Sequence, residues 1–238
     1  VNADYVRQII NLTQTTSGSY LLLASLDISR RNLALRGEES FAKVMDMAEY
    51  ARMEINEIGG YYAYGKELVN GTSVYDYDVT KLSVHTLGLG LAGIEVYDLL
   101  RDEYDIQIEF GDVSNILAYI SIGDRLQDIE RLVGALADIA RIYKKDSTGM
   151  LSGEFISPIV ARSPQEAFYS AKESLPVEKT EGRISGEFVM CYPPGIPILA
   201  PGEMITDEII QYILYVKEKG CSMQGTEDKS VNKLKVLV

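Results

Sequence analysis

The chain has 238 residues, of which 46% are hydrophobic and 24% are charged, enough to build a substantial hydrophobic core. Its 35 acidic and 23 basic residues give a net charge of -12, which disfavours nucleic acid and anionic membranes as partners. Two cysteines and one histidine argue against a zinc site and a disulfide framework, and they fit a reducing cytoplasm. No apolar run approaches the ~20 residues that cross a bilayer, so we expect a cytoplasmic protein.

Helices are predicted for most of the first sixty residues. Residues 4–12 form a short helix, and the apolar run LLLASL at 21–26 begins a second helix, which we expect to be buried. Residues 38–57 form an amphipathic third helix that ends at a pair of glycines. The Gly- and Tyr-rich residues 59–78 show no periodicity and indicate a linker or an interface segment.

Three hydroxyl residues, Thr15, Thr16 and Ser17, precede the second helix. Their side chains can cap the helix, and its free N–H groups and positive dipole end suit an anion such as phosphate. Capping is the more common role of such residues, so the local sequence leaves both roles open.

The middle of the chain has the order strand, helix, strand, strand, helix. This is a split βαβ order, which predicts a small sheet with helices on one side. The segments are, in the same order, 79–86, 87–104, 106–110, 115–121 and 124–143. Asp124 and Gln127 have the spacing of a capping box at the start of the last helix.

Gly88, Gly90 and Gly93 match the pattern G-x-G-x-x-G between a strand and a helix, and Glu109 follows near the end of the next strand. A dinucleotide-binding domain needs parallel strands in further βα units. Here the turn at Gly111 is too short for a parallel connection. We therefore expect these glycines to form the corner between strand and helix.

The last third begins after a polar connector at residues 144–162. The sequence SPQE at 163–166 has a capping-box pattern with proline at the first helical position, and it predicts a helix over 163–175. A final helix starts after Thr206 and runs through IIQYILYVKEK, and KLKVL at 233–237 predicts a short strand.

The segment Gly182–Glu203 starts as a strand and then contains four prolines. Proline fixes φ and lacks an N–H donor, so this run is rigid and extended and cannot join a helix or a central strand. It ends in Glu203, one residue past a glycine. A stiff loop that presents one carboxylate suits recognition of a polar group, but a proline-rich connector has the same composition. Local chemistry leaves both interpretations open.

Several segments carry a resemblance that runs in order along almost the whole chain. They are TTSGSYLLLASLDISRR, DYDVTKLSVHTLGLGLAGIEVYDLL, ISIGDRLQDIERLVGAL, EFVMCYPPGIPILAPGE and QGTED. These segments resemble the C-terminal portion of the bacterial ornithine/lysine/arginine decarboxylases, and YPPGIP…PGE is the most specific of them. Within that family the chain is most similar to the shorter arginine decarboxylase-type members of Gram-positive bacteria.

The resemblance implies a pyridoxal 5'-phosphate enzyme of the aspartate-aminotransferase fold type. Such an enzyme removes carbon dioxide from arginine, lysine or ornithine and makes agmatine or a diamine for polyamine metabolism. The family binds its cofactor on a lysine that directly follows a histidine, whereas His85 here is followed by Thr86. The resemblance places that lysine before Val1, and the sequence starts without methionine. We therefore expect a fragment that is inactive without the N-terminal part.

The resemblance also implies roles for individual residues. Thr15, followed by Thr16 and Ser17, resembles the residues that reach the cofactor phosphate of a partner subunit, which implies a homo-oligomer. Glu203 resembles the acid that faces the distal cation of the substrate, and a carboxylate can pair an ammonium or hold a guanidinium through two hydrogen bonds. Cys191 stands where relatives often carry proline, and we expect a buried packing residue there.

The expected fold class is α/β, with an α+β small domain. Residues 1–60 are expected to end the cofactor-binding large domain, 61–150 to form the split βαβ small domain, and 151–238 to form the C-terminal decarboxylase domain. Two alternatives stay open. One is a non-catalytic paralogue or processed fragment with an assembly or regulatory role, and the other is a small-molecule binding module with its ligand near Gly88–Gly93.

Overall fold

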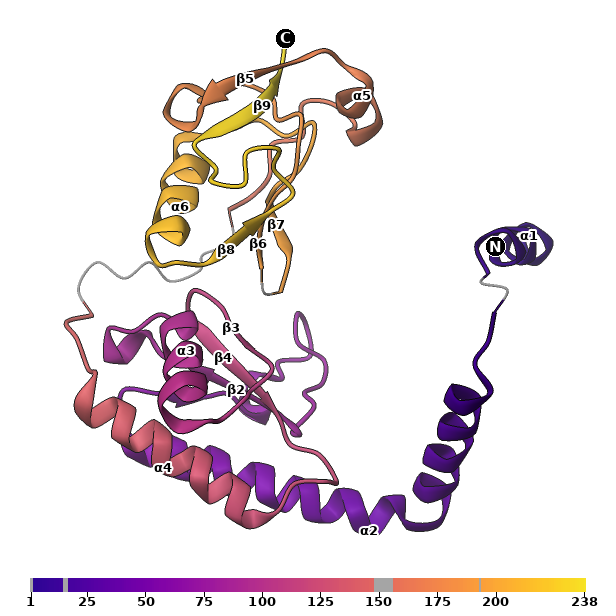
Figure 1. Cartoon of the computed structure of the whole chain (residues 1–238), viewed down its shortest axis with the longest axis vertical. Helices are drawn as coiled ribbons and strands as arrows, with labels where there is room; N and C mark the ends of the chain where they lie inside the picture. Colours follow the sequence, from indigo (N-terminus) through magenta and orange to yellow (C-terminus); the bar gives the residue numbers. More distant parts are fainter. Residues whose placement is uncertain (1, 15–16, 148–155, 193) are drawn as a thin grey trace. The chain divides into compact units, whose positions relative to one another are not determined.

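The computed structural model describes residues 2–14, 17–147, 156–192 and 194–238. The chain divides into two compact units, Val1–Val44 and Met45–Val238. Helices combine with small antiparallel sheets, which confirms the predicted α/β class (Figure 1). Within the described ranges, no helix has both the length and the apolar character that a membrane crossing requires.

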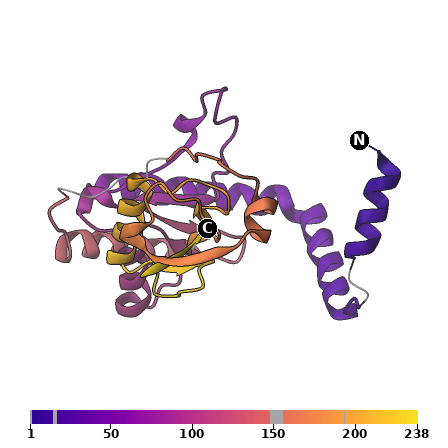
Figure 2. The ribbon, with the colours of Figure 1, turned by 90° about the horizontal axis from the view of Figure 1, so that it is seen from above.

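The first unit contains α1 (Ala3–Thr13) and the first part of α2 (Tyr20–Ile58). The Asn2 side chain caps α1 by accepting hydrogen bonds from the N–H groups of Asp4 and Tyr5 at 3.1 and 3.3 Å. α2 is one helix of 39 residues that begins in the first unit and ends in the second, and its ribbon can be followed in Figure 2. Two separate helices were predicted here, and that division is wrong because no proline interrupts the run and Gly37 adopts helical geometry.

The apolar start of α2 is exposed rather than buried. Leu21, Leu22 and Leu26 are 84%, 67% and 66% exposed. The prediction of a buried helix is therefore wrong for this chain, because no described element of the first unit covers these side chains. A helix that is apolar on all sides is usually covered by other parts of a protein. The pattern does not identify the segment that covers it.

The second unit begins with the last part of α2 and a four-stranded sheet of order β1-β2-β4-β3, in which every neighbouring pair is antiparallel. The strands are β1 (Tyr62–Ala63), β2 (Lys81–His85), β3 (Phe110–Gly111) and β4 (Asn115–Tyr119). Because β4 lies between β2 and β3 and is antiparallel to both, β2 and β3 are parallel to each other. This arrangement confirms the predicted split βαβ order.

Two helices accompany this sheet, α3 (Gly93–Tyr104) and α4 (Leu126–Ile142), together with short 3₁₀ turns at Lys66–Leu68 and Leu87–Leu89. Alternate residues of β2 and β4 point into the core, where they meet apolar side chains of the helices. The buried residues include Leu82, Val84, Ile116, Ala118, Val96, Leu100, Leu132, Leu136 and Ile139. The buried hydroxyl of Tyr61 also donates to the carbonyl of Leu136 at 3.1 Å, which joins the segment after α2 to α4.

The start of α4 and the extent of β3 differ from the prediction. The N–H of Arg125 donates to the Asp128 carboxylate at 3.0 Å, so the cap lies one residue later than the predicted pair. Asp124 instead accepts from the N–H of Ser121 at 2.6 Å, in the turn that precedes the helix. Residues 106–109, predicted as strand, lie outside β3, because the register with β4 covers only Phe110–Gly111 and the Glu109 N–H adds a single bond to the Leu117 carbonyl at 3.0 Å.

The remaining part of the second unit contains a two-stranded sheet, β5–β9, and a three-stranded sheet of order β7-β6-β8. Its elements are α5 (Pro164–Tyr169), β5 (Lys172–Pro176), a 3₁₀ turn (Val177–Lys179), β6 (Val189–Tyr192), β7 (Ile196–Leu199), α6 (Asp207–Glu218), β8 (Ser222–Gln224) and β9 (Lys233–Leu237). An apolar core joins α6 to these strands through Val189, Leu199, Ile205, Ile209, Ile213, Leu234 and Val236.

The capping predictions for this part are confirmed, but one helix is shorter than predicted. Ser163 Oγ accepts from the N–H of Glu166 at 3.2 Å, and the Glu166 carboxylate accepts from the N–H of Ser163 at 3.0 Å. The Thr206 hydroxyl caps α6 by accepting from Ile209 N–H at 3.3 Å. Residues 172–176 form a strand instead of helix because they pair along their whole length with β9.

Candidate functional site

The proline-rich segment forms a β-hairpin made of β6 and β7. Gly195 supplies the turn with φ of 89°, a conformation that favours glycine, and its N–H donates to the Cys191 carbonyl at 2.9 Å. β7 contains Pro197 and is an edge strand of the sheet. Proline lacks a backbone N–H, and at an edge this does not interrupt the hydrogen bonds of a central strand. The central strand β6 contains no proline, and Pro197 lies in the edge strand, so the prediction that the prolines join neither a helix nor a central strand is confirmed for Pro197.

Glu203 ends this segment in a tight turn. Its N–H donates to the carbonyl of Ala200 at 3.2 Å, and its carboxylate oxygen Oε2 accepts from the N–H of Ala200 at 2.8 Å. The side chain is half-buried. One carboxylate oxygen is therefore held by the turn, which orients the group, and the second oxygen retains its capacity to accept further hydrogen bonds.

The backbone beside Glu203 is held from two sides. The carbonyl of Gly202 accepts from the N–H groups of Ala161 and Arg162 at 2.9 and 3.0 Å, and Gly202 N–H donates to Ser185. Ser185 N–H in turn donates to the Glu203 carbonyl at 2.8 Å. Gly202 has φ of 94°, and a β-carbon there would collide with the Arg162 carbonyl. These contacts make the turn a stiff support for one carboxylate.

The hydroxyl residues before α2 are only partly described. Thr15 and Thr16 lie outside the described residues, and Ser17 is exposed just before the helix. At the start of α2 the Leu23 N–H donates to the Ser19 carbonyl at 3.0 Å, so the N–H groups of the preceding turn point out of the helix start. Ser17 belongs to the first unit and Glu203 to the second.

The glycine motif packs against backbone. A β-carbon at Gly93 would collide with the carbonyl of Asn115, and one at Gly88 would lie 2.6 Å from the carbonyl oxygen of Gly60. Gly90 has φ of 69° and lies against the carbonyl of Lys145. Chain atoms occupy the space that a phosphate would need, and β2 is antiparallel to β4. The prediction that these glycines form a packed corner is confirmed, which also weighs against a ligand at Gly88–Gly93.

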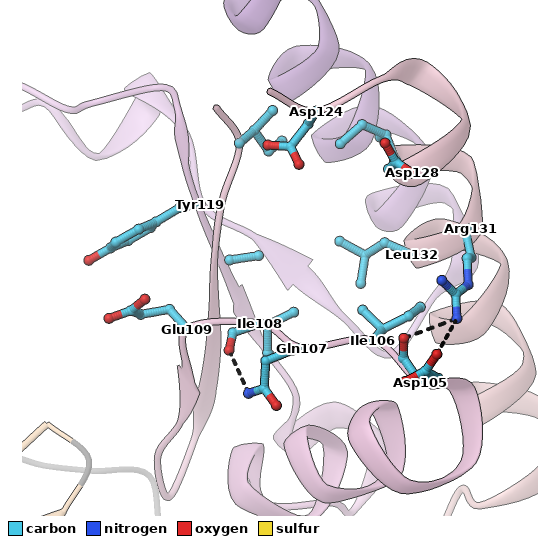
Figure 3. Close-up of a pocket in the computed structure, with 13 residues that line it drawn as sticks. Asp105, Ile106, Gln107, Ile108, Glu109, Tyr119, Asp124, Asp128, Arg131 and Leu132 are labelled. Atoms are coloured by element: carbon cyan, nitrogen blue, oxygen red, sulfur yellow. Dashed lines mark hydrogen bonds and ion pairs between the residues drawn. The ribbon is translucent and has the colours of Figure 1, made fainter. Parts of the chain in front are cut away.

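A cavity of about 420 Å³ lies between α4 and the edge of the four-stranded sheet (Figure 3). The sequence analysis did not predict this cavity. Four acids within 24 residues of the chain could have indicated it. The lining includes Asp105, Glu109, Asp124 and Asp128, together with Tyr119 and Arg131. Several of these acids already have partners inside the protein. Arg131 contacts Asp105, Arg125 pairs with Asp128, and Ser121 binds Asp124.

His85 has a structural environment. Its Nδ1 lies 3.3 Å from the side-chain oxygen of Asn115, which also accepts from the Tyr64 hydroxyl at 3.2 Å. Neither contact pairs the histidine with a serine or cysteine nucleophile. Across the residues that the structure describes, no cluster of three or more His, Cys, Asp or Glu side chains could hold a metal ion.

Both cysteines are buried, Cys191 at 9% and Cys221 at 8% exposure. They share a small apolar cluster with Val113 and Val216. The expectation that Cys191 is a buried packing residue is confirmed. Sequence reasoning did not foresee that Cys221 lies beside it, because that contact depends on how α6 leads back into β8.

Comparison with known proteins covers the whole chain. Residues 153–229 match a family model described as Orn/Lys/Arg decarboxylase, C-terminal domain. The chain is 40% identical over 240 residues to a Bacillus subtilis protein named arginine decarboxylase, and 41% identical over 243 residues to one from Halalkalibacterium halodurans. Each alignment includes all of this chain and 49% of the relative, so the chain spans about half the length of these relatives.

Solved structures show the same fold at lower sequence identity. The constitutive lysine decarboxylase of E. coli aligns with a TM-score of 0.72 and 18% identity, over 100% of this chain and 46% of that one. Lysine decarboxylase A from Pseudomonas aeruginosa aligns with a TM-score of 0.70 and 17% identity, over 100% and 45%. The chain therefore fits the C-terminal portion of an Orn/Lys/Arg decarboxylase-like protein.

Proposed function

We propose that this chain supplies the C-terminal portion of a pyridoxal 5'-phosphate-dependent decarboxylase that acts on arginine, lysine or ornithine. The observation that carries the proposal is the 40% identity to a relative named arginine decarboxylase along the entire chain. The complete enzyme would make agmatine or a diamine for polyamine metabolism, as a cytoplasmic homo-oligomer that includes the N-terminal part.

The donor chemistry before α2 fits the phosphate of that cofactor. Thr15, Thr16 and Ser17 offer hydroxyl groups next to the start of a long helix, and a helix start presents N–H groups and a positive dipole end. These residues would bind and orient the phosphate, with Thr15 as the first candidate. When bound, the cofactor supplies a conjugated ring that accepts the electron pair left as carbon dioxide departs.

Glu203 would bind the distal end of the substrate. The bond from Ala200 N–H orients its carboxylate, and the backbone hydrogen bonds of Ser185 with Gly202 and Glu203 hold the turn that carries it. A pre-oriented carboxylate loses little side-chain freedom when it pairs with a cation, so it suits the ammonium of lysine or ornithine or the guanidinium of arginine. Glu203 would thus select for a basic side chain and take no part in moving protons.

Glu203→Gln in the full-length gene product tests this role. Glutamine keeps an oxygen that can accept from Ala200 N–H, so the turn persists while the charge disappears. A charge-assisted hydrogen bond contributes about 1.5–3 kcal/mol, so we expect KM for the basic amino acid to rise by roughly 10- to 100-fold. We expect kcat to change little, because the lost contact is made equally in the ground state and transition state.

Glu218→Gln is the matched control, since Glu218 is an exposed acid at the end of α6 in the same part of the chain. Steady-state release of carbon dioxide from arginine, lysine and ornithine gives both constants. Unchanged KM in Glu203→Gln would remove Glu203 from the substrate site. If the unsubstituted protein, supplied with cofactor, released no carbon dioxide from any of the three, the decarboxylase proposal itself would fail.

A further inference from the structure

The two cysteines of the chain lie close together in one sheet, Cys191 within β6 and Cys221 directly before the neighbouring strand β8. Cys191, in β6, stands opposite Met223 of β8. Cys221 is two residues before Met223, and residues two apart on a strand share a face, so Cys221 is a diagonal neighbour of Cys191. Their placement together in the cluster with Val113 and Val216 agrees with this register.

The two cysteine side chains belong to the same buried cluster. The neighbouring Cys221 thiol lowers the pKa of the Cys191 thiol against the opposing effects of burial and of the Asp112 carboxylate. The neighbouring Cys191, burial and the nearby charges raise the pKa of Cys221. Each cysteine is therefore the main influence on the ionisation of the other, and the thiolate is the form that reacts.

A cavity reaches Cys221, one member of this pair. Cys221 lines a cavity of about 670 Å³, together with residues of β8 and with Lys217 and Lys229. The ammonium of Lys217 is held at the cavity by the side chain of Asn232 at 2.6 Å. A molecule the size of a peroxide can enter such a cavity, even though each cysteine side chain is largely buried.

We infer that Cys191 and Cys221 are a site of reversible disulfide formation, with hydrogen peroxide or another small hydroperoxide as the oxidant. One thiol reduces the peroxide, becomes a sulfenic acid and releases water. The second thiol attacks that sulfur, the S–S bond forms, and a second water leaves. Two electrons pass from the two thiols to one peroxide, and thiol exchange with a small reductant reverses the reaction.

The disulfide would join the end of β6 to the chain that leads into β8. β6 continues directly into the hairpin turn at Gly195 and then into β7. The bond would therefore restrain one end of this hairpin. The inference rests on the cluster that the cysteines share and on the cavity, and it stands independently of the decarboxylase proposal.

Peptide mapping of the full-length gene product tests the inference. The reduced, folded protein is treated with hydrogen peroxide, its remaining thiols are alkylated, and it is digested with trypsin without reductant. We expect a linked species that joins the peptide Ile184–Lys217 to the peptide Gly220–Lys229, lighter than the sum of the two by two hydrogens. Dithiothreitol should release both peptides with free thiols.

Two control experiments test whether the disulfide forms only when the protein is folded and both cysteines are present. Protein unfolded in urea before the same treatment should give much less of this linked species, because the sulfurs are then far apart. Cys221→Ala should leave Cys191 as a sulfenic acid that dimedone labels, with no linked peptide. The inference is overturned if the folded protein yields only alkylated cysteines, or cysteines oxidised singly to sulfinic acid, while the unfolded protein reacts.

Discussion

At Gly93 the start of α3 approaches β4 so closely that a β-carbon would collide with the carbonyl of Asn115. The space is bounded by backbone on a paired strand, which cannot shift without breaking ladder hydrogen bonds. Gly134, in the interior of α4, is the opposite case, because a β-carbon there would meet nothing within 4 Å. The same residue type thus has two different roles within one small fold.

Gly93→Ala should lower the free energy of unfolding by about 1–3 kcal/mol, the usual cost of forcing extra volume into packed structure. Gly134→Ala is the control and should raise it by about 0.5–1 kcal/mol, because alanine favours a helix interior over glycine. Urea unfolding followed by circular dichroism measures both. If Gly93→Ala were as stable as the unsubstituted protein, the packed corner would not be as close as described.

Whether the role of a single residue could be predicted depended on how near its partners lie along the chain. Ser163 and Thr206 were predicted as caps and are caps, because a capping bond spans three residues. The cap of α4 moved from Asp124 to Arg125, since the Asp124 carboxylate binds the N–H of Ser121 in the preceding turn. Which of two adjacent residues starts the helix depends on the path by which the chain enters it, and the local sequence pattern does not specify that path.

Between elements, an ion pair ties the start of α3 to the segment after α4. Lys145 Nζ lies 2.7 Å from Glu95 Oε1, while the second oxygen of Glu95 accepts from the N–H of Ala92 at 2.8 Å. Burial raises the pKa of Glu95, but the bonds from Lys145 and Ala92 outweigh it, so the pKa lies below its usual value of 4.5. The carboxylate is thus more favoured in the folded protein than in the unfolded chain.

Lys145→Met should lower the free energy of unfolding at pH 7 by at most about 1 kcal/mol, because the pair is partly exposed. A carboxyl with a lowered folded pKa contributes stability above pH 4.5 and loses it as the pH falls through the folded pKa. The difference between variant and unsubstituted protein should therefore shrink below pH 4.5. Urea unfolding at several pH values measures it.

Lys144→Met serves as the control, because Lys144 is the exposed neighbouring lysine. It should change stability little at any pH. If Lys145→Met lowered the free energy of unfolding equally at acidic and neutral pH, the loss would come from packing of the lysine side chain and not from the ion pair.

Element boundaries were predicted less well than element order. The order of the split βαβ part follows from hydrophobic periodicity and turn lengths, and the structure confirms it. Residues 172–175, the end of the helix predicted over 163–175, belong to β5 instead, because their partner β9 lies about sixty residues further along the chain. A strand with a distant partner gains its stability from that partner, so a local window cannot detect it.

At the scale of the whole chain, the sequence contains no lysine that directly follows its one histidine, since His85 precedes Thr86. If the family's mode of cofactor attachment applies, the 238 residues cannot hold the cofactor covalently. The chain also spans about half the length of its relatives. Activity is therefore expected of the complete enzyme and not of these residues alone.

The 238-residue chain, supplied with pyridoxal 5'-phosphate, should release no carbon dioxide from arginine, lysine or ornithine. The full-length gene product should release it from at least one of them under the same conditions. Circular dichroism of the chain establishes that it is folded when the assay is run. Turnover by the chain alone would mean that one of its own lysines binds the cofactor, and the proposed division of roles would be wrong.

The sequence by itself determined the caps at Ser163 and Thr206, the split βαβ order, the exclusion of proline from a central strand and the resemblance to decarboxylases. Each depends on bonds within a few residues, on periodicity or on a matching motif. Only the tertiary structure decided that Leu21–Leu26 are exposed, that Ala200 and Ser185 hold the Glu203 turn, and that Cys191 and Cys221 share one buried cluster. These features depend on segments far apart in the chain, whose approach is governed by packing of the whole unit.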